Sequence, residues 1–140
     1  MQTIVRDQAK KYAFDWRDEP LLRVHEGETI AIETWDASTG FFKTPEDKAI
    51  PAKRPGFDRS PPMANPIAGP VFIIGAERGD VLVACIEEVE VADYSWVAVG
   101  PKRGPLGEST RWPELSAEYT TKIFPHTPGP RGTTLDGNLQ

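Results

Sequence analysis

The chain has 140 residues, of which 39% are hydrophobic, a formal net charge of −5 and a single cysteine, Cys85. This length predicts one domain over residues 1–140, and the apolar content argues against wholesale disorder. The acidic balance argues against a nucleic-acid partner, and the lone cysteine excludes a disulfide framework or a four-thiolate zinc site within the chain.

Two further features concern location and class. Residues 1–16 lack the apolar region of a secretory signal, and no run approaches the roughly 18 apolar residues of a membrane span. We therefore expect no membrane contact and a soluble cytoplasmic protein. The 14 prolines and 12 glycines are spread along the chain, which favours a β protein with many turns.

The first part of the chain predicts short strands. Residues 12–16 (YAFDW) alternate aromatic and other side chains, residues 21–24 form a second apolar piece, and residues 29–34 (TIAIET) alternate most clearly. The turn signal at residues 26–28 lies between the last two pieces and predicts a hairpin.

A short helix and a long loop are expected next. Thr44 can cap a helix and Pro45 suits its first position, so residues 44–47 (TPED) predict a helix start. Residues 51–66 are too rich in proline for regular structure. This loop either covers surface or lines a site.

Residues 65–90 predict a strand, a tight turn and a second strand. Residues 69–74 suit a buried strand, and residues 75–80 carry glycines available for positive φ. Residues 81–91 (VLVACIEEVEV) are rich in β-branched side chains and predict a long strand, with a helix as the alternative.

The last part of the chain is less regular. Residues 93–99 continue as extended chain, and residues 100–107 predict a loop. Residues 111–122 fit a helix or a strand equally, and residues 124–140 form a tail rich in Gly, Pro and Thr.

Several segments, in this order, resemble the N-terminal half of the acetamidase/formamidase family, over roughly residues 22–140. Arg78 stands where proline is usual in the family. The matching segments are residues 27–30 (GETI) with 33–37 (ETWDA), 65–73 (NPIAGPVFI), 75–82 (GAERGDVL) and 124–130 (FPHTPGP).

The resemblance implies a mainly β fold of the β-sandwich type and hydrolysis of a small amide to a carboxylate and ammonia. It also implies a divalent metal, with zinc as the expected ion, and a later portion that supplies further strands and site residues. The sequence stops at residues 136–140, where a strand is expected to begin. A truncated chain, a split gene or a processed precursor would each fit, and we expect a complementary C-terminal chain in a hetero-oligomer.

The metal ligands should be His, Asp or Glu, because the chain has no thiolate cluster. Asp36 matches the family's D-A pair and either faces a cleft or caps the turn at residues 38–40. Glu87 and Glu88 are adjacent on an expected strand, so they face opposite sides. Glu88 aligns with an acidic position of the family and is a candidate ligand or general base, unless both are surface charges.

Two other side chains complete the candidate site. His126 lies inside a resembling segment as a candidate ligand or catalytic residue, or as a loop histidine, whereas His25 is expected at the surface. Asn65 either binds substrate or braces its loop. The hypothesis is that Asp36, Glu88 and His126 converge on a metal that activates water.

Two alternatives remain open. One is a non-catalytic β-sandwich that binds a small ligand or a partner protein. The other is a related C–N or C–S hydrolase with a bulkier substrate. Four tryptophans could line its pocket or simply pack in the core: Trp16, Trp35, Trp96 and Trp112.

Overall fold

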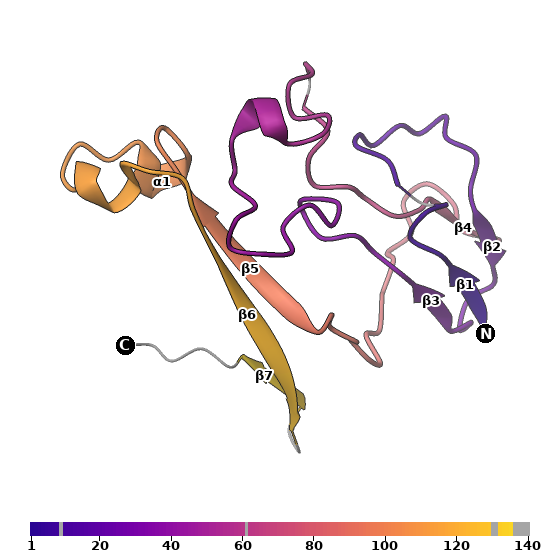
Figure 1. The fold of residues 1–140 in the computed structure, drawn as a ribbon. Helices are drawn as coiled ribbons and strands as arrows, with labels where there is room; N and C mark the ends of the chain where they lie inside the picture. Colours follow the sequence, from indigo (N-terminus) through magenta and orange to yellow (C-terminus); the bar gives the residue numbers. More distant parts are fainter. Residues whose placement is uncertain (9, 61, 130–131, 136–140) are drawn as a thin grey trace. The chain divides into compact units, whose positions relative to one another are not determined.

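The computed structural model describes residues 1–8, 10–60, 62–129 and 132–135, and its regular structure is mainly strand (Figure 1). The strands are β1 (Gln2–Ile4), β2 (Leu22–Val24), β3 (Ile30–Ile32), β4 (Val71–Ile73), β5 (Tyr94–Val99), β6 (Thr120–Gly129) and β7 (Gly132–Leu135). The helical turns are η1 (Pro51–Lys53), α1 (Gly104–Gly107) and η2 (Pro113–Ser116). No helix in these ranges reaches seven residues, which confirms the predicted mainly β class. None of these helices is long and apolar enough to cross a membrane.

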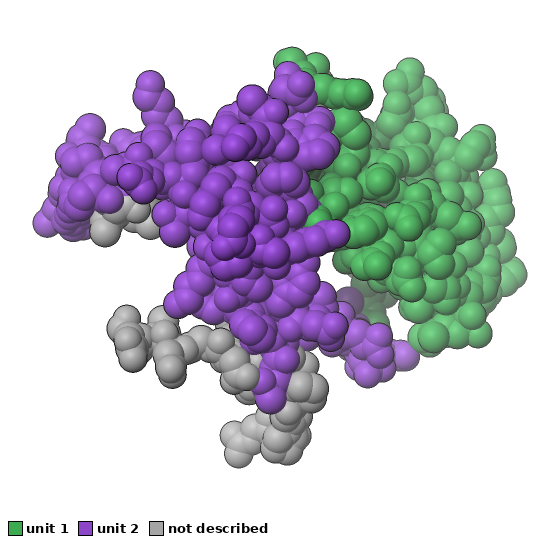
Figure 2. Space-filling view, in the orientation of Figure 1, with its two compact units in different colours: residues 1–40, 59–85 green, residues 41–58, 86–140 purple. Residues whose placement is uncertain are grey.

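The chain forms two compact units, coloured separately in Figure 2. Unit 1 comprises Met1–Gly40 and Arg59–Cys85, and unit 2 comprises Phe41–Asp58 and Ile86–Gln140. Each unit is therefore built from two stretches that are separated in sequence. The prediction of a single domain over residues 1–140 stays a prediction.

Unit 1 contains two small parallel sheets. β1 pairs with β3, with Ile4 opposite Ile32, and β2 pairs with β4, with Val24 opposite Ile73. The Ile74 N–H extends the second ladder by donating to the Val24 carbonyl at 2.7 Å. Ile4 and Val24 are buried, so each sheet contributes one apolar side chain to the interior of the unit.

The strands predicted at residues 21–24 and 29–34 are confirmed, but the hairpin predicted between them is wrong. The turn itself is present: the Glu28 N–H donates to the His25 carbonyl at 3.3 Å, and the Glu28 carboxylate accepts from the His25 N–H at 2.8 Å. The two strands that leave it pair with β4 and β1 instead of each other. Parallel partners need long crossover connections, so they come from distant parts of the chain.

Residues 12–16 form no strand, contrary to prediction. The Asp15 carbonyl accepts a hydrogen bond from the Asp18 N–H at 3.1 Å, which closes a turn. Phe14 and Trp16 are 91% and 93% exposed. The alternating aromatic side chains therefore do not pack on a sheet, and the alternation did not indicate a strand here.

Gly40 ends the turn after β3 in a left-handed conformation, with φ of 72°. A Cβ at this position would lie 2.7 Å from Cζ3 of Trp35, so the ring would have to move. We expect Gly40→Ala to lower the free energy of unfolding by about 1–3 kcal/mol, measured by urea denaturation. Gly27→Ala is the matched control, because φ is 79° there but no atom lies within 4 Å. Equal losses in the two variants would contradict the steric role of Trp35.

Unit 2 contains the antiparallel sheet β5–β6–β7. β5 and β6 pair from Tyr94 opposite Pro125 to Val99 opposite Thr120, and β6 continues against β7 with His126 opposite Leu135. β5 confirms the extended chain predicted at residues 93–99. The β6–β7 pair was not predicted, because prolines and glycines hide the alternation of the tail. The strand expected to begin at residues 136–140 lies outside the described residues.

Phe42 is the centre of packing in unit 2. It is 1% exposed, and its ring centroid lies 4.3 Å from that of Trp96 on β5 and 5.0 Å from that of Phe41. The Thr121 hydroxyl on β6 donates to the Asp47 carbonyl at 2.6 Å. These contacts attach residues 41–47 to the sheet. The sequence left open whether the four tryptophans line a pocket or pack in the core. Trp96 packs against Phe42.

Residues 44–47 form a turn around the Asp47 carboxylate, and the helix predicted to start here is wrong. Asp47 Oδ2 accepts hydrogen bonds from the N–H groups of Lys43 and Thr44, each at 2.8 Å. The Asp47 N–H donates to the Thr44 carbonyl at 3.1 Å. A side chain that reaches back to the backbone in this way favours a turn over a helix.

The same contacts give stability a dependence on pH. The N–H of Lys43, and then that of Thr44, lower the pKa of Asp47 below its usual value. Because the pKa is lower in the folded state, the carboxylate stabilises the fold above the unfolded pKa, about 3.9, and this contribution is lost as pH falls through the folded pKa. We expect Asp47→Asn to lose less stability than the wild type on acidification, measured as the urea midpoint at several acidic pH values. Asp58→Asn is the control, and coincident Asp47→Asn and wild-type curves would contradict the prediction.

The segment predicted as strand, turn and strand is confirmed in its first two parts, except that the first strand is not buried as predicted: Phe72 is 44% exposed. β4 is the first strand, and the turn follows with Gly75 and Gly79 at φ of 88° and 109°. Residues 81–91 form no ladder with the described residues, so the predicted second strand is wrong as a paired strand. Its side chains are exposed throughout. Residues 51–60 and 62–66 form the predicted loop, with η1 and turns.

Candidate functional site

Asp36 organises a tight turn beyond β3. Its Oδ1 accepts hydrogen bonds from the N–H and the hydroxyl of Ser38, both at 2.6 Å, and from the Gly40 N–H at 3.1 Å. The Thr39 N–H donates to the Asp36 carbonyl at 2.9 Å. Because one Asp36 oxygen accepts from three donors, Asp36 caps this turn. Capping the turn was one of the two roles expected for Asp36 from the sequence; the other was a place in the site.

Asn65 lies next to this turn. Its N–H donates to the Ala37 carbonyl at 3.1 Å, and its φ of 54° is in the left-handed region that asparagine tolerates. The Asn65 side chain is exposed. Two segments far apart in the sequence, both part of the family resemblance, therefore meet in unit 1.

His126 is fixed by two hydrogen bonds within unit 2. Its N–H donates to the Asp93 carbonyl at 2.7 Å, and its Nδ1 lies 2.5 Å from the Ala92 carbonyl oxygen. A carbonyl only accepts, so Nδ1 carries the hydrogen of this bond, and Nε2 is the ring nitrogen that takes no part in it. A backbone carbonyl holds metal-binding histidines in the same way.

Glu87 and Glu88 lie in the exposed segment of residues 81–91. In extended chain, successive side chains point to opposite sides, so one of the pair faces away from the other. The Glu88 side chain is exposed to solvent.

The structure brings two of the four predicted site residues together. Asp36 and Asn65 meet in unit 1, whereas Glu88 and His126 both belong to unit 2. Within the described ranges, no group of three or more His, Cys, Asp or Glu side chains is arranged to hold a metal ion. With one Asp36 oxygen already bound by three donors, the described side chains do not form a complete metal site. The convergence of Asp36, Glu88 and His126 stays a prediction.

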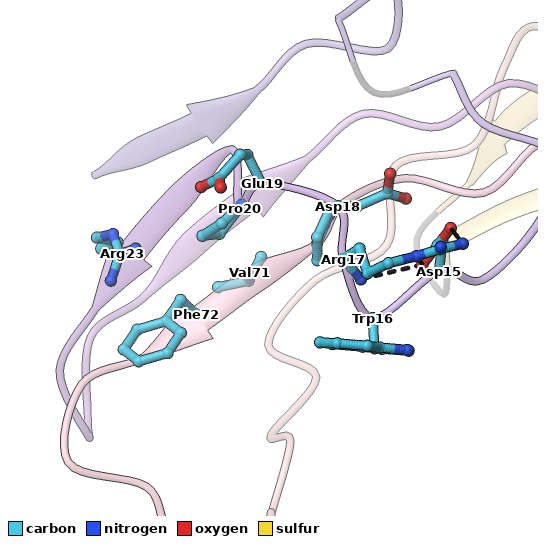
Figure 3. Close-up of a pocket in the computed structure, with 10 residues that line it drawn as sticks. Asp15, Trp16, Arg17, Asp18, Glu19, Pro20, Arg23, Val71 and Phe72 are labelled. Atoms are coloured by element: carbon cyan, nitrogen blue, oxygen red, sulfur yellow. Dashed lines mark hydrogen bonds and ion pairs between the residues drawn. The ribbon is translucent and has the colours of Figure 1, made fainter.

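Unit 1 also contains a hollow of about 530 Å³ that the sequence did not indicate (Figure 3). Arg23 and Phe72 are register partners on β2 and β4, and the guanidinium carbon lies 4.5 Å from the ring centroid. The signal that could have revealed the hollow is the charged run of residues 15–19 directly before Pro20. The lining comprises Asp15, Trp16, Arg17, Asp18, Glu19, Pro20, Arg23, Pro70, Val71 and Phe72.

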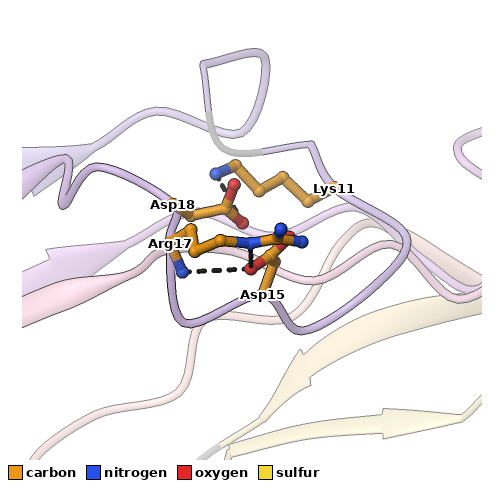
Figure 4. Close-up of polar contacts among 4 residues, drawn as sticks. All are labelled: Lys11, Asp15, Arg17 and Asp18. Atoms are coloured by element: carbon orange, nitrogen blue, oxygen red, sulfur yellow. Dashed lines mark hydrogen bonds and ion pairs between the residues drawn. The ribbon is translucent and has the colours of Figure 1, made fainter.

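The charges at one end of the hollow are paired (Figure 4). The Arg17 guanidinium donates to both Asp15 oxygens, at 2.9 and 2.7 Å, and Lys11 Nζ lies 2.8 Å from Asp18 Oδ2. The Arg17 side chain lowers the pKa of Asp15, and Asp15 raises the pKa of Arg17. Asp15 is therefore held as an anion, which makes it unsuitable as a general acid.

Comparison with known proteins gives matches among solved structures. No family model and no curated protein matches the chain. The acetamidase of Bacillus halodurans matches with a TM-score of 0.65 and 24% identity, over 88% of this chain and 37% of that one. A predicted acetamidase/formamidase of the thermophile Thermoanaerobacter tengcongensis matches with a TM-score of 0.74 and 27% identity, over 99% of this chain and 40% of that one. The chain spans about two fifths of the solved structures it matches, and over that span it has the acetamidase/formamidase fold that its sequence resembles.

Proposed function

We propose that the chain is one part of an amide hydrolase that cleaves the C–N bond of a small linear amide to give a carboxylate and ammonia or an amine. The observation that carries this proposal is the match of 99% of the chain to a predicted acetamidase/formamidase, at a TM-score of 0.74. The match covers 40% of that protein, so the proposal includes a complementary C-terminal chain or portion.

Glu88 is the proposed general base. Its exposed carboxylate would take a proton from water as the water oxygen attacks the amide carbonyl carbon. The C–N bond then breaks, and the proton passes from Glu88 to the leaving nitrogen. His126 would orient the water through Nε2, since Nδ1 is held by the Ala92 carbonyl. The exposed Asn65 amide is the proposed substrate contact.

A divalent metal, with zinc as the expected ion, is part of the proposal. When bound, it would polarise the carbonyl and lower the pKa of a water ligand. In a metal-bound enzyme His126 Nε2 would be a ligand instead of orienting the water directly, and the Glu88 carboxylate would be either a further ligand or the base, not both. Asp36 would have to use Oδ2, because Oδ1 holds the turn. Any further ligands would come from the complementary portion.

Ammonia release from formamide and acetamide by the intact assembly tests this function, with the metal content measured on the same sample. We expect release that a chelator abolishes and zinc restores. Full activity without metal would remove the metal from the proposal. Absence of ammonia from both amides would overturn the amidase itself.

The hollow in unit 1 favours a second candidate, a module that binds a small ligand without catalysis. Its volume of about 530 Å³ is within the range of about 300–1,000 Å³ for small-molecule sites, and the exposed Trp16 ring at its edge could stack on a planar ligand. A hydrolase of a bulkier substrate would use the same space. Ligand binding that Trp16→Ala abolishes, in an assembly that releases no ammonia, would favour the binding module.

A further inference from the structure

The loop of residues 11–20 in unit 1 is anchored at both ends to the segment that leads into β4. At its start, Lys11 exchanges two backbone hydrogen bonds with Ile67, at 3.2 and 2.8 Å. Directly after its end, the Leu21 N–H donates to the Pro70 carbonyl at 2.9 Å. The loop forms one side of the hollow, so these contacts fix that side relative to β4.

Two ion pairs fix the middle of the same loop (Figure 4). Asp15 and Arg17 are joined by two side-chain hydrogen bonds, at 2.9 and 2.7 Å, and the Arg17 N–H donates to Asp15 Oδ1 at 3.0 Å. Lys11 pairs with Asp18 at 2.8 Å. Trp16 lies between the two members of the first pair, so the backbone that carries its indole is already ordered. A ligand that binds against Trp16 therefore does not have to order this loop.

The same ion pairs determine which charges of the hollow are uncompensated. The charged side chains that line it are Asp15, Arg17, Asp18, Glu19 and Arg23. Asp15 and Asp18 are neutralised by the cations just described. Glu19 and Arg23 have no ion-pair partner in the part of the chain that the structure describes. The hollow therefore presents one uncompensated negative group and one uncompensated positive group.

Arg23 is placed to bind an anion through the edge of its guanidinium. The guanidinium carbon lies over the Phe72 ring, 4.5 Å from its centroid, and the two residues are register partners on β2 and β4. This contact uses a face of the guanidinium, whereas its five N–H donors lie in its plane. A carboxylate fits that plane with two parallel hydrogen bonds.

The remaining lining provides an apolar surface and a flat ring. The apolar side chains, apart from the rings of Trp16 and Phe72, are Pro20, Pro70 and Val71. Figure 3 shows the Glu19 and Arg23 side chains toward one end of the hollow and Trp16 toward the other. An indole ring binds a second aromatic ring by offset stacking or by an edge-to-face contact. The hollow therefore suits a ligand with two opposite charges at one end and an aromatic ring at the other.

We propose that the hollow binds a zwitterionic amino acid with an aromatic side chain. Its carboxylate binds Arg23, its ammonium binds Glu19, and its ring contacts Trp16. A carboxylic acid without the ammonium would place an anion beside Glu19, and an amine without the carboxylate would place a cation beside Arg23. The proposal rests on the ligand-binding candidate function and not on amide hydrolysis, and every lining residue belongs to unit 1.

Calorimetric titration of the intact assembly with four related ligands tests the proposal. L-phenylalanine carries all three groups, whereas 3-phenylpropionate lacks the ammonium, phenethylamine lacks the carboxylate and L-alanine lacks the ring. We expect phenylalanine to bind with a Kd below about 1 mM and each of the other three to bind at least about 10-fold more weakly. The proposal would be overturned by phenylalanine that does not bind, or by any of the other three binding as tightly as phenylalanine.

Substitutions assign each charge of the ligand to its partner. Glu19→Gln should weaken phenylalanine binding by about 10-fold and reduce its advantage over 3-phenylpropionate to less than about 3-fold. Arg23→Gln should do the same for its advantage over phenethylamine. The controls make the same changes outside the hollow: Glu26→Gln, and Arg111→Gln, whose guanidinium also lies over a ring, 4.5 Å from the Trp112 centroid. If each advantage persists in its variant, or if the controls weaken binding equally, the assignment is wrong.

Competition separates the hollow from the site of amide hydrolysis. Excess acetamide is added to an assembly with Glu88→Gln, which should consume it slowly, and the Kd for phenylalanine should stay within about 2-fold. Displacement of phenylalanine by acetamide would place its binding at the amide site and overturn the proposal. Ammonia release is measured on the unmodified assembly: phenylalanine binding without ammonia release refutes the amidase alone, and ammonia release without phenylalanine binding refutes the ligand site alone.

Discussion

Replacing Glu88 with glutamine is expected to lower kcat for acetamide by about 100-fold or more, with a much smaller change in KM. General bases contribute about 10²–10⁴ to rate, and glutamine keeps the size of the side chain but cannot take a proton. The measurement is steady-state ammonia release by the intact assembly.

The neighbouring glutamate provides the matched control. Glu87 is also exposed, and in an extended chain it would point to the side opposite Glu88, so Glu87→Gln should keep kcat within about 2-fold. Glu88→Asp should recover part of the activity, because it keeps the carboxylate. The role of Glu88 as a base would be refuted if Glu88→Gln retained full activity, or if both amide variants lost activity equally.

Replacing Phe42 with alanine is expected to have the largest effect on stability. Phe42 is 1% exposed and contacts Trp96 and Phe41, so its removal leaves a cavity at the centre of unit 2. Such truncations cost about 3–5 kcal/mol, which is a large share of the roughly 5–15 kcal/mol that stabilises a typical domain. The expected result is a large drop in the urea midpoint, followed by circular dichroism.

Phe14→Ala is the control for this substitution. Phe14 is 91% exposed, so the same chemical change should alter stability by less than about 0.5 kcal/mol. Phe42→Leu should fall between the wild type and Phe42→Ala, since it keeps part of the buried volume. A loss below about 1 kcal/mol for Phe42→Ala would show that this contact does not hold residues 41–47 on the sheet.

The fold could be predicted where one local signal decides the structure. Alternation at residues 29–34 predicts β3, and glycines at positive φ predict the turn at residues 75–80. Pairing could not be predicted, because β1–β3 and β2–β4 are parallel and join distant segments. The helix predicted at residues 44–47 failed because the Asp47 side chain binds the backbone N–H groups before it.

The site could be predicted only in part for the same reason. The family resemblance singled out Asp36 and Asn65, but their meeting depends on a backbone hydrogen bond to Ala37 that no local pattern indicates. The hydrogen bond that orients His126 also comes from a residue distant in sequence, Ala92. The orientation of Glu88 could not be predicted, because the strand expected at residues 81–91 forms no ladder with the described residues that would fix which way its side chain points.

The exposed segment of residues 81–91 also has a consequence for synthesis in the cell. Residues 81–86 (VLVACI) combine high β propensity with no charge and no proline, which is the composition of segments that assemble into fibrils. Glu87, Glu88 and Glu90 follow directly and act as gatekeepers, because their charges oppose stacking of identical chains. A cell that made this chain in excess would therefore depend on these charges to keep residues 81–86 from driving aggregation.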